Sequence, residues 1–385
     1  MSIVLLYIFC QLRLVDISSN SETLVNNNNR YLALDAFRGI TIALMILVNT
    51  PGTWSHVFSP LLHADWHGVT PTDLIFPFFL FIIGSALYFA FSKSNFEFSP
   101  LAVAKIIKRS VIIFLIGLGL NIYAQVADME NLRVMGVLQR LGIAYGIGAV
   151  LVLLLTWRQL ILACVAILIG YWLLMTIGNS DPYSLDHNVV RSFDLAVIGE
   201  NHLWQGKGIA FDPEGLLSTL PAIVNVLTGF LATMLLAYAP SKIDSIKRLS
   251  LFGVMFIVIS LFWNVIMPIN KSLWTSSYVV FSTGCAFFVL AFFIWLVDIK
   301  AQLKLVDPLL VYGSNPLFIY VLSWLWVATY QFISIGDLTL YQYLYEQLAV
   351  FLAPKVASFT FAFIHVAIFW FISNVLYRRS IFIKV

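Results

Sequence analysis

Long apolar runs separated by short polar stretches form the main pattern along the chain. A helix of about 20 residues is long enough to cross the hydrocarbon core of a bilayer. Ten runs reach this length, at approximately residues 32–50, 71–92, 105–125, 134–156, 159–178, 215–238, 250–268, 274–297, 308–330 and 352–376. The pattern therefore predicts an all-α, polytopic transmembrane helix bundle with about ten spans.

The start of the chain has a different pattern. An apolar run at residues 3–15 is interrupted by Gln11 and Arg13 and is followed by a polar, asparagine-rich stretch. We interpret residues 1–29 as a short apolar leader or a poorly ordered start, and residues 30–385 as one transmembrane core. Residues 179–214 form the longest polar connection, which is either a lid over a site or a simple connector.

Composition agrees with a membrane protein. Hydrophobic residues make up 61% of the 385 residues and charged residues only 11%, whereas soluble domains average about 25% charged. The three cysteines are far apart in apolar surroundings, which favours small packing residues over a disulfide framework or a zinc cluster. The net charge of +3 gives no indication of a nucleic-acid partner.

Lysine and arginine positions predict the orientation. With the start of the first span in the cytoplasm, 16 of the 22 fall on the cytoplasmic side and five on the opposite side, while Arg140 lies inside a span. This bias follows the positive-inside rule. Both termini are therefore expected in the cytoplasm, and residues 51–70 and 179–214 on the outer face.

Several polar residues are expected at or near membrane depth, where their cost makes them candidates for function. Asp35 and Arg38 lie one helical turn apart and either form an ion pair at a helix end or leave Arg38 free for a ligand. In the second case Arg38 joins a cationic entrance that binds phosphate, with Lys105, Lys108, Arg109, Arg378 and Arg379. Arg140 either pairs with an acid inside the membrane or lines a cofactor path or an outer pocket.

Residues 61–79, LLHADWHGVTPTDLIFPFF, bring two histidines and two aspartates to the outer start of a span. His63 is a candidate for acid–base or nucleophilic work on an acyl group. Asp73 either stabilises the first turn of the helix or orients a neighbouring imidazole. His63 and His67, four residues apart, leave a zinc site conceivable, but no third ligand has a motif spacing, so we predict none.

Other outer polar residues have both a structural and a binding interpretation. Asn49 either ends the first span or orients a histidine. Asp212 and Glu214, in FDPEG, either cap a helix that has Pro213 at its first position or meet a sugar amine. His202, Asn270 and Lys271 are further candidates for binding an acceptor. Tryptophans either stack on sugar rings or form an interfacial belt: Trp66, Trp204 and Trp274.

At the predicted cytoplasmic end, Asn315 precedes Pro316 at the start of the ninth span. Asn315 either caps that helix or contacts the arm of a cofactor.

Seven sequence blocks, taken together, resemble one known family. These are LALDAFRGITIALMILVN, LLHADWHGVTPTDLIFPFFLFIIG, MGVLQRLGIAYG, AFDPEGLLSTLPAI, PINKSLWTSSYV, YGSNPLFIYV and YRRSIFIKV. They are similar, in the same order, to heparan-alpha-glucosaminide N-acetyltransferase and its bacterial relatives, from about Arg30 to Val385. The luminal N-terminal region of the animal enzyme and its leading span have no counterpart here.

The resemblance implies transfer of acetyl from cytoplasmic acetyl-CoA to the amine of a terminal glucosamine on the far side. The family's catalytic histidine falls on His63 and its nearby asparagine on Asn49, whereas His67 stands where the animal enzyme carries asparagine. The resemblance also implies a homodimer, and the missing luminal region favours the bacterial inner membrane. An amino-sugar transporter without acyl transfer remains the alternative.

The chemistry predicts how such a site works. A charged nucleotide does not cross the hydrocarbon, so its phosphates are expected near cytoplasmic cations while the thioester reaches His63. His63 then either deprotonates the sugar amine or carries the acetyl group itself. We expect five residues on the acetyl-CoA path: Arg38, Arg109, Arg140, Asn315 and Arg378. We expect six at the acceptor: Asp212, Glu214, His202, Asn270, Lys271 and Trp66.

Overall fold

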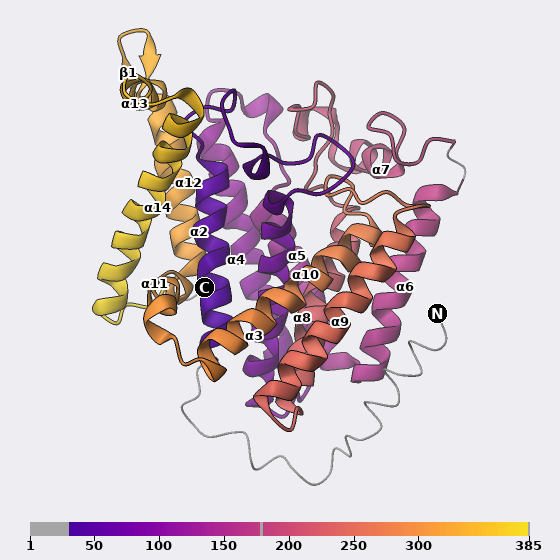
Figure 1. The fold of residues 1–385 in the computed structure, drawn as a ribbon. Coiled ribbons are helices and arrows are strands. Elements are labelled where there is room, and N and C mark those ends of the chain that lie inside the picture. The colour runs from indigo at the N-terminus through magenta and orange to yellow at the C-terminus, as the bar shows by residue number, and fades with distance from the viewer. Residues whose placement is uncertain (1–30, 178–179, 384–385) are drawn as a thin grey trace.

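The computed structural model describes residues 31–177 and 180–383, and most of this part of the chain is helical (Figure 1). The predicted leader, residues 1–29, lies outside the described residues. The long helices are α2 (Leu32–Asn49), α3 (Ile75–Ser92), α4 (Pro100–Ala124), α5 (Val137–Leu154), α6 (Trp157–Thr176), α8 (Thr219–Ala237), α9 (Lys242–Trp263), α10 (Ser276–Ile294), α11 (Leu303–Ser314), α12 (Pro316–Phe332) and α14 (Pro354–Arg378).

Shorter elements connect these helices. They are the α-helices α7 (Val189–Ile198) and α13 (Leu340–Ala349), the 3-10 helices η1 (Ser59–Leu61), η2 (Pro71–Leu74), η3 (Met129–Asn131) and η4 (Glu200–His202), and the π-helical turn η5 (Trp295–Ile299). Strands β1 (Ser334–Ile335) and β2 (Leu338–Thr339) pair antiparallel, with Ser334 opposite Thr339. The predicted all-α class is confirmed.

Within the described residues, eight helices are long and apolar enough to cross a membrane, or nine if α11 and α12 together form one broken span. The predicted span at residues 308–330 is not one straight helix, because it covers parts of α11 and α12, which meet at an angle of 74°. Pro316 begins α12, and its missing N–H and fixed φ favour a new helix start there. The predicted span at residues 105–125 corresponds to α4, which packs along α5.

Close backbone contacts hold the centre of the bundle together. α3 and α8 approach each other closely at Gly84 of α3 and Gly229 of α8. A Cβ added at Gly84 would lie 1.8 Å from the Val226 carbonyl oxygen, and one added at Gly229 would lie 1.9 Å from the Phe81 carbonyl oxygen. Only glycine permits this approach, which is a common device in membrane helix pairs. Ser85 adds a hydrogen bond to the Gly229 carbonyl oxygen at 3.1 Å.

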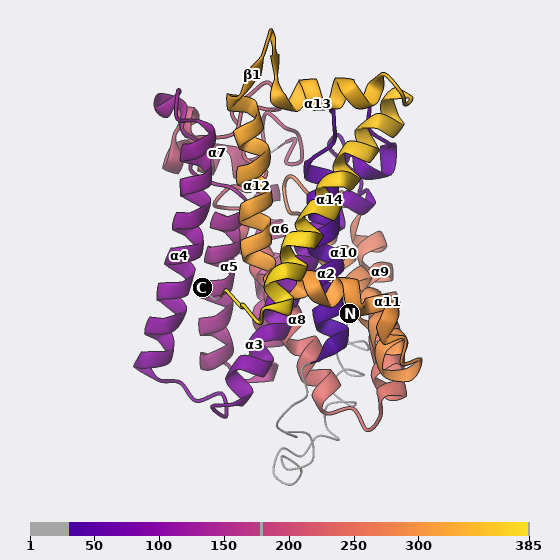
Figure 2. The same cartoon turned by 90° about the vertical axis from the view of Figure 1, so that its left-hand side faces the viewer.

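The bundle has two ends of different character. One end, at the top of Figure 1, carries the connections around α7 and the chain between α2 and α3; we name it the His63 end. The other carries the start of α2, the α8–α9 turn and α11; we name it the Arg38 end. Figure 2 shows α13 lying across the His63 end, between the upper ends of α12 and α14.

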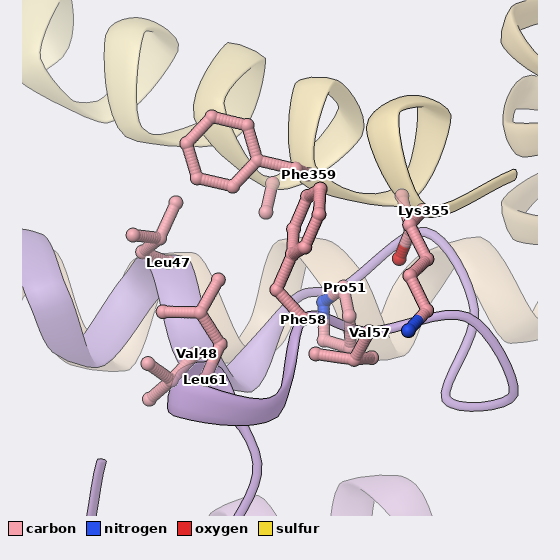
Figure 3. A pocket seen from close by; sticks show the side chains of 10 residues that line it. Leu47, Val48, Pro51, Val57, Phe58, Leu61, Lys355 and Phe359 are labelled. Carbon is pink, nitrogen blue, oxygen red and sulfur yellow. The ribbon is translucent and has the colours of Figure 1, made fainter. Parts of the chain in front are cut away.

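A shallow apolar groove of about 240 Å³ lies between the end of α2, the chain that follows it and the start of α14 (Figure 3). Its lining consists of Leu47, Val48, Pro51, Val57, Phe58, Leu61, Lys355, Ser358, Phe359 and Ala362. These residues provide no acid–base pair, so the candidate chemistry lies elsewhere at the same end.

Candidate active site

A capping box fixes Asp73 at the start of η2. The order Thr-Pro-Thr-Asp places Thr70 at the N-cap, proline at the first helical position and Asp73 at the third. The Asp73 Oδ2 accepts hydrogen bonds from the Thr70 backbone N–H at 2.9 Å and the Thr70 hydroxyl at 3.0 Å. Asp73 is almost fully buried, so this local motif holds the carboxylate in one position.

The same carboxylate holds His63. Asp73 Oδ1 lies 2.7 Å from His63 Nδ1, and the backbone N–H of Ala64 donates to Asp73 Oδ2 at 3.1 Å. An ionised carboxylate only accepts hydrogen bonds, so the shared proton belongs to Nδ1. This arrangement leaves Nε2 of the half-exposed His63 ring with a free lone pair. Both sequence interpretations of Asp73, capping and imidazole orientation, are therefore present in the structure.

Helix α10 contacts the backbone of Asp73 and so helps to hold the His63–Asp73 pair. The Tyr278 hydroxyl donates to the Asp73 backbone carbonyl oxygen at 2.5 Å. Tyr278 is fully buried and packs edge-on against Trp274, with ring centroids 5.2 Å apart. Trp274 is fully buried too, so the suggestion that it stacks on a sugar ring is wrong.

The connection between α9 and α10 brings Lys271 to the histidine. Its Nζ lies 3.2 Å from His63 Nδ1 and 3.3 Å from Nε2. Buried Asn270 fixes this connection, because its Oδ1 accepts from the Leu273 backbone N–H at 2.8 Å. The sequence proposed Asn270 for the acceptor, but its amide serves the loop and approaches only His67, at 3.4 Å.

A backbone bridge joins the two segments. Gly68 pairs with Asn270, and its N–H donates to the Ile269 carbonyl oxygen at 2.8 Å. Gly68 has φ +98°, which residues with a Cβ rarely adopt. His63 and His67 lie in this irregular segment and not on a helix, so their four-residue spacing does not place them on one helical face.

A second cluster of charges lies at the same end. Arg133 Nε and Nη2 bind the two oxygens of Asp212 at 2.8 and 2.7 Å, and Nη2 also binds Glu214 at 2.7 Å. Burial lowers the pKa of Arg133, but the two facing carboxylates outweigh burial and raise it above the ordinary value. Burial alone would raise the pKa of Glu214, but Arg133 and then Lys271 lower it.

Arg133 is the main residue that the sequence interpretation missed. It was counted only as one of five outer cations, and nothing in ENLRV predicts a partner about 80 residues away. The prediction that Asp212 caps a helix is wrong, since α8 begins later, at Thr219 with Ser218 as its N-cap. Asp212 and Glu214 instead lie buried in the chain before α8 and bind the guanidinium.

Arg140 is fully buried in the first half of α5 and belongs to this end of the molecule. One of its nitrogens, Nη2, donates to the Gly215 carbonyl oxygen at 3.2 Å and to the Ser218 hydroxyl. Its guanidinium carbon lies 4.7 Å from the Trp274 ring centroid, at cation–π distance. The structure therefore separates Arg140 from the acetyl-CoA residues with which the sequence interpretation grouped it.

Asp194 of α7 closes this cluster. Its Oδ1 accepts from the backbone N–H groups of Leu216 and Leu217, both at 3.1 Å, while Oδ2 is buried without a hydrogen-bond partner. Burial raises the pKa of Asp194 to about 6. The sequence interpretation did not single out Asp194.

Asn225, in the middle of α8, is a second missed residue. Its Oδ1 accepts from the Trp274 indole N–H at 3.1 Å, and its Nδ2 donates to Ser282 and Thr283 at 3.3 and 3.4 Å. A signal was available, because an asparagine inside the apolar run AIVNVLTG needs a buried partner.

Three other predicted residues lie near this end without touching His63. His202 Nδ1 lies 2.8 Å from the Leu132 carbonyl oxygen and so supports the chain that carries Arg133. Trp66 donates to the Tyr183 carbonyl oxygen at 2.7 Å and packs against Phe211, which anchors the outer loop. Asn49 is the exposed last residue of α2.

The remaining predicted residues lie toward the Arg38 end. Arg38 binds Asp35 at 2.9 Å and the Gly313 carbonyl oxygen of α11 at 3.4 Å. Both ends of the Asn315 amide bind the C-terminal segment. Its Nδ2 donates to the Ile381 carbonyl oxygen at 2.9 Å, and its Oδ1 accepts from the Ile383 backbone N–H at 2.7 Å. Arg109 is exposed on α4, over the Tyr145 ring, and Arg378 is exposed at the end of α14.

Comparisons with known proteins agree with the resemblance seen in the sequence blocks. Residues 30–202 match the family model described as heparan-alpha-glucosaminide N-acetyltransferase, catalytic. Over 356 residues, 76% of this chain, it is 29% identical to the Homo sapiens heparan-alpha-glucosaminide N-acetyltransferase, and over 361 residues it is 28% identical to the Mus musculus protein. The chain spans about half the length of these relatives, 52% and 54%. The predicted resemblance is confirmed.

Proposed function

We propose that this chain, an integral membrane protein related to the heparan-alpha-glucosaminide N-acetyltransferases, transfers acetyl from acetyl-CoA to the amine of glucosamine or a glucosaminide. The observation that carries the proposal is the Asp73–His63 hydrogen bond of 2.7 Å, which engages Nδ1 of a half-exposed ring and leaves Nε2 for chemistry, with Lys271 Nζ 3.3 Å away. The pair lies within residues 30–202, the part that matches the catalytic family model.

The first chemical step needs a base or a nucleophile, and His63 Nε2 provides either. In direct transfer, Nε2 takes a proton from the sugar ammonium, the amine attacks the thioester carbonyl, and the C–S bond breaks as the tetrahedral intermediate collapses. In the covalent route, Nε2 attacks first and the amine then displaces it from the acetyl group. In both routes the CoA thiolate leaves and takes up a proton.

The two ends of the bundle fit the two substrates. Carboxylates and aromatic groups surround the His63 end, where a sugar amine would bind. Exposed arginines lie toward the Arg38 end, where bidentate donors suit the phosphates of CoA. Arg109 and Arg378 fit this role better than Asn315, because the C-terminal segment already occupies both ends of the Asn315 amide.

The broken span offers a route between the ends. Irregular backbone at membrane depth is stable only where protein covers it or where it lines a cavity. The break between α11 and α12 lies beside Arg38, whose guanidinium reaches the Gly313 carbonyl oxygen. In this proposal the phosphates stay at the Arg38 end on the cytoplasmic side, and the pantetheine arm extends from there toward His63.

The resemblance supports two further parts of the proposal: a homodimer and a place in the bacterial inner membrane with the His63 end facing the periplasm. Labelling of a cysteine introduced at exposed His56 by a membrane-impermeant reagent in intact cells tests this orientation. Labelling only after the membrane is opened would reverse it.

The decisive experiment uses the purified full chain, radiolabelled acetyl-CoA and glucosamine. We expect labelled N-acetylglucosamine from the wild type and a loss of about 10³–10⁴-fold in His63→Ala, since that variant lacks the acid–base or nucleophilic group. His56→Ala removes an exposed histidine of the same outer segment and is the matched control. Uptake of the amino sugar into sealed, CoA-free vesicles without acetyl transfer would support the transporter instead.

A further inference from the structure

Lys271 has a position that binding an acceptor does not explain. Its Nζ is almost equidistant from the two ring nitrogens of His63, at 3.2 and 3.3 Å. A donor in line with one lone pair lies in the ring plane and much farther from the other nitrogen. The near-equal distances therefore place the ammonium over the face of the imidazole.

The structure fixes this position from both sides. Lys271 follows Asn270, which is fully buried and hydrogen-bonded to Thr275 at 3.0 Å as well as to Leu273. The Gly68–Asn270 bridge holds the histidine segment against the lysine segment. A lysine that only contacted a sugar in solvent would not need a backbone held by so many hydrogen bonds.

Charged groups around Lys271 act in opposite directions. Removal from water lowers the pKa of its ammonium most, and Arg140 and Arg133 lower it further, while Glu214 and Asp73 oppose these effects. The lysine thus stands between the His63–Asp73 pair and the Arg133–Asp212–Glu214 cluster. Its Nζ contacts His63, and its charge acts on both Asp73 and Glu214.

We propose that Lys271 is a catalytic residue that stabilises the oxyanion formed when the thioester carbonyl is attacked beside His63 Nε2. This inference rests on the proposed acetyl transfer and assigns a further group to the same site. As the new C–N bond forms, the carbonyl electron pair moves to oxygen. The Lys271 ammonium then donates a hydrogen bond to that oxyanion until the pair returns and the C–S bond breaks.

The test compares Lys271→Met with Lys271→Arg in the full chain. We expect kcat of Lys271→Met to fall about 10²–10³-fold, as for loss of one oxyanion donor, with KM for both substrates within about threefold of the wild type. Lys271→Arg keeps a cation that can donate to the oxyanion and should recover part of kcat.

Lys207→Met is the matched control, because Lys207 is also an outer lysine but donates to the Asp65 carbonyl oxygen at 2.6 Å and not to His63. An unchanged kcat in Lys271→Met, or a loss expressed only as a higher KM, would overturn the role of Lys271. If Lys271→Met fails to fold, the kcat values of Lys271→Gln and Lys271→Arg decide the question. Absence of acetyl transfer in the wild type would instead overturn the proposed function.

Discussion

The two ends of the bundle organise their charges in different ways. At the His63 end, side chains from η2, the α4–α5 connection, the chain before α8 and the α9–α10 connection bind one another across long sequence separations. At the Arg38 end, the cations pair locally or lie exposed, as Arg38 does with Asp35 and as Arg378 does at the end of α14. The first end holds its charged groups in one connected arrangement, whereas the charges of the second end are dispersed and more exposed.

This difference has an energetic reason. Buried ionic groups are stable only when each is paired and hydrogen-bonded, so they specify a single arrangement. Exposed ion pairs contribute little and leave the side chains free to rebind. Substitutions at the His63 end should therefore have large effects on activity or stability, and these effects should depend on which partner residues remain. Substitutions at the Arg38 end should have small effects that are independent of one another.

Apart from the loss of His63 itself, the largest effect on activity is expected for Asp73→Asn. An amide at this position donates to His63 Nδ1 as readily as it accepts, so it permits the tautomer with the proton on Nε2. We expect kcat to fall about 10³-fold, or about 4 kcal/mol in the barrier, measured with radiolabelled acetyl-CoA. Asp65→Asn, an exposed aspartate of the same segment, should retain activity. Equal activity in the two variants would show that the imidazole is not held by its carboxylate.

Arg133→Met should have the largest effect on stability. It leaves Asp212 and Glu214 buried without their cation, which costs about 3–5 kcal/mol. Thermal unfolding in detergent measures the loss. The triple variant Arg133→Met, Asp212→Asn, Glu214→Gln removes all three charges and should recover much of the stability. A triple variant as unstable as the single one would contradict the charge explanation.

A smaller and pH-dependent effect is expected for Asp194→Asn. The folded carboxyl has a pKa of about 6, above the unfolded value of about 4, so the folded chain holds this proton more tightly. The stability that the protonated Asp194 carboxyl contributes is thus fully present below about pH 4 and is lost as the pH rises through 6. The variant should be about 1–2 kcal/mol more stable than the wild type at pH 7.5 and should lose that advantage toward pH 4. Unfolding temperatures across this range give the difference, and a difference independent of pH would refute the assignment.

Arg38→Gln should have the smallest effect. Its partly exposed ion pair with Asp35 contributes at most about 1 kcal/mol to stability. We expect KM for acetyl-CoA to rise a few-fold, because one phosphate donor is lost, while kcat stays near the wild-type value. Steady-state kinetics distinguish the two parameters, with exposed Lys247→Gln on α9 as the control. A loss of kcat instead would place Arg38 closer to the reacting groups than the proposal does.

The sequence determined the helices, because apolar runs of membrane length leave the backbone no other way to satisfy its hydrogen bonds. It also determined the position of Asp73, since Thr70, Pro71 and Asp73 form a capping box within four consecutive residues. The segment around His63 stands out because two histidines and two aspartates lie close together in the sequence. These features depend on neighbours in the chain, so the sequence alone is enough to predict them.

Only the tertiary structure decided which distant residues meet. The Arg133–Asp212 pair, the placement of Lys271 over His63 and the bend between α11 and α12 depend on how helices pack and on where the connections between them run. The spacing within FDPEG was equally compatible with a helix start and with a pair of carboxylates for a cation. The fold favours the second arrangement, because it brings the partly buried guanidinium of Arg133 against both carboxylates, which are themselves buried and need a partner.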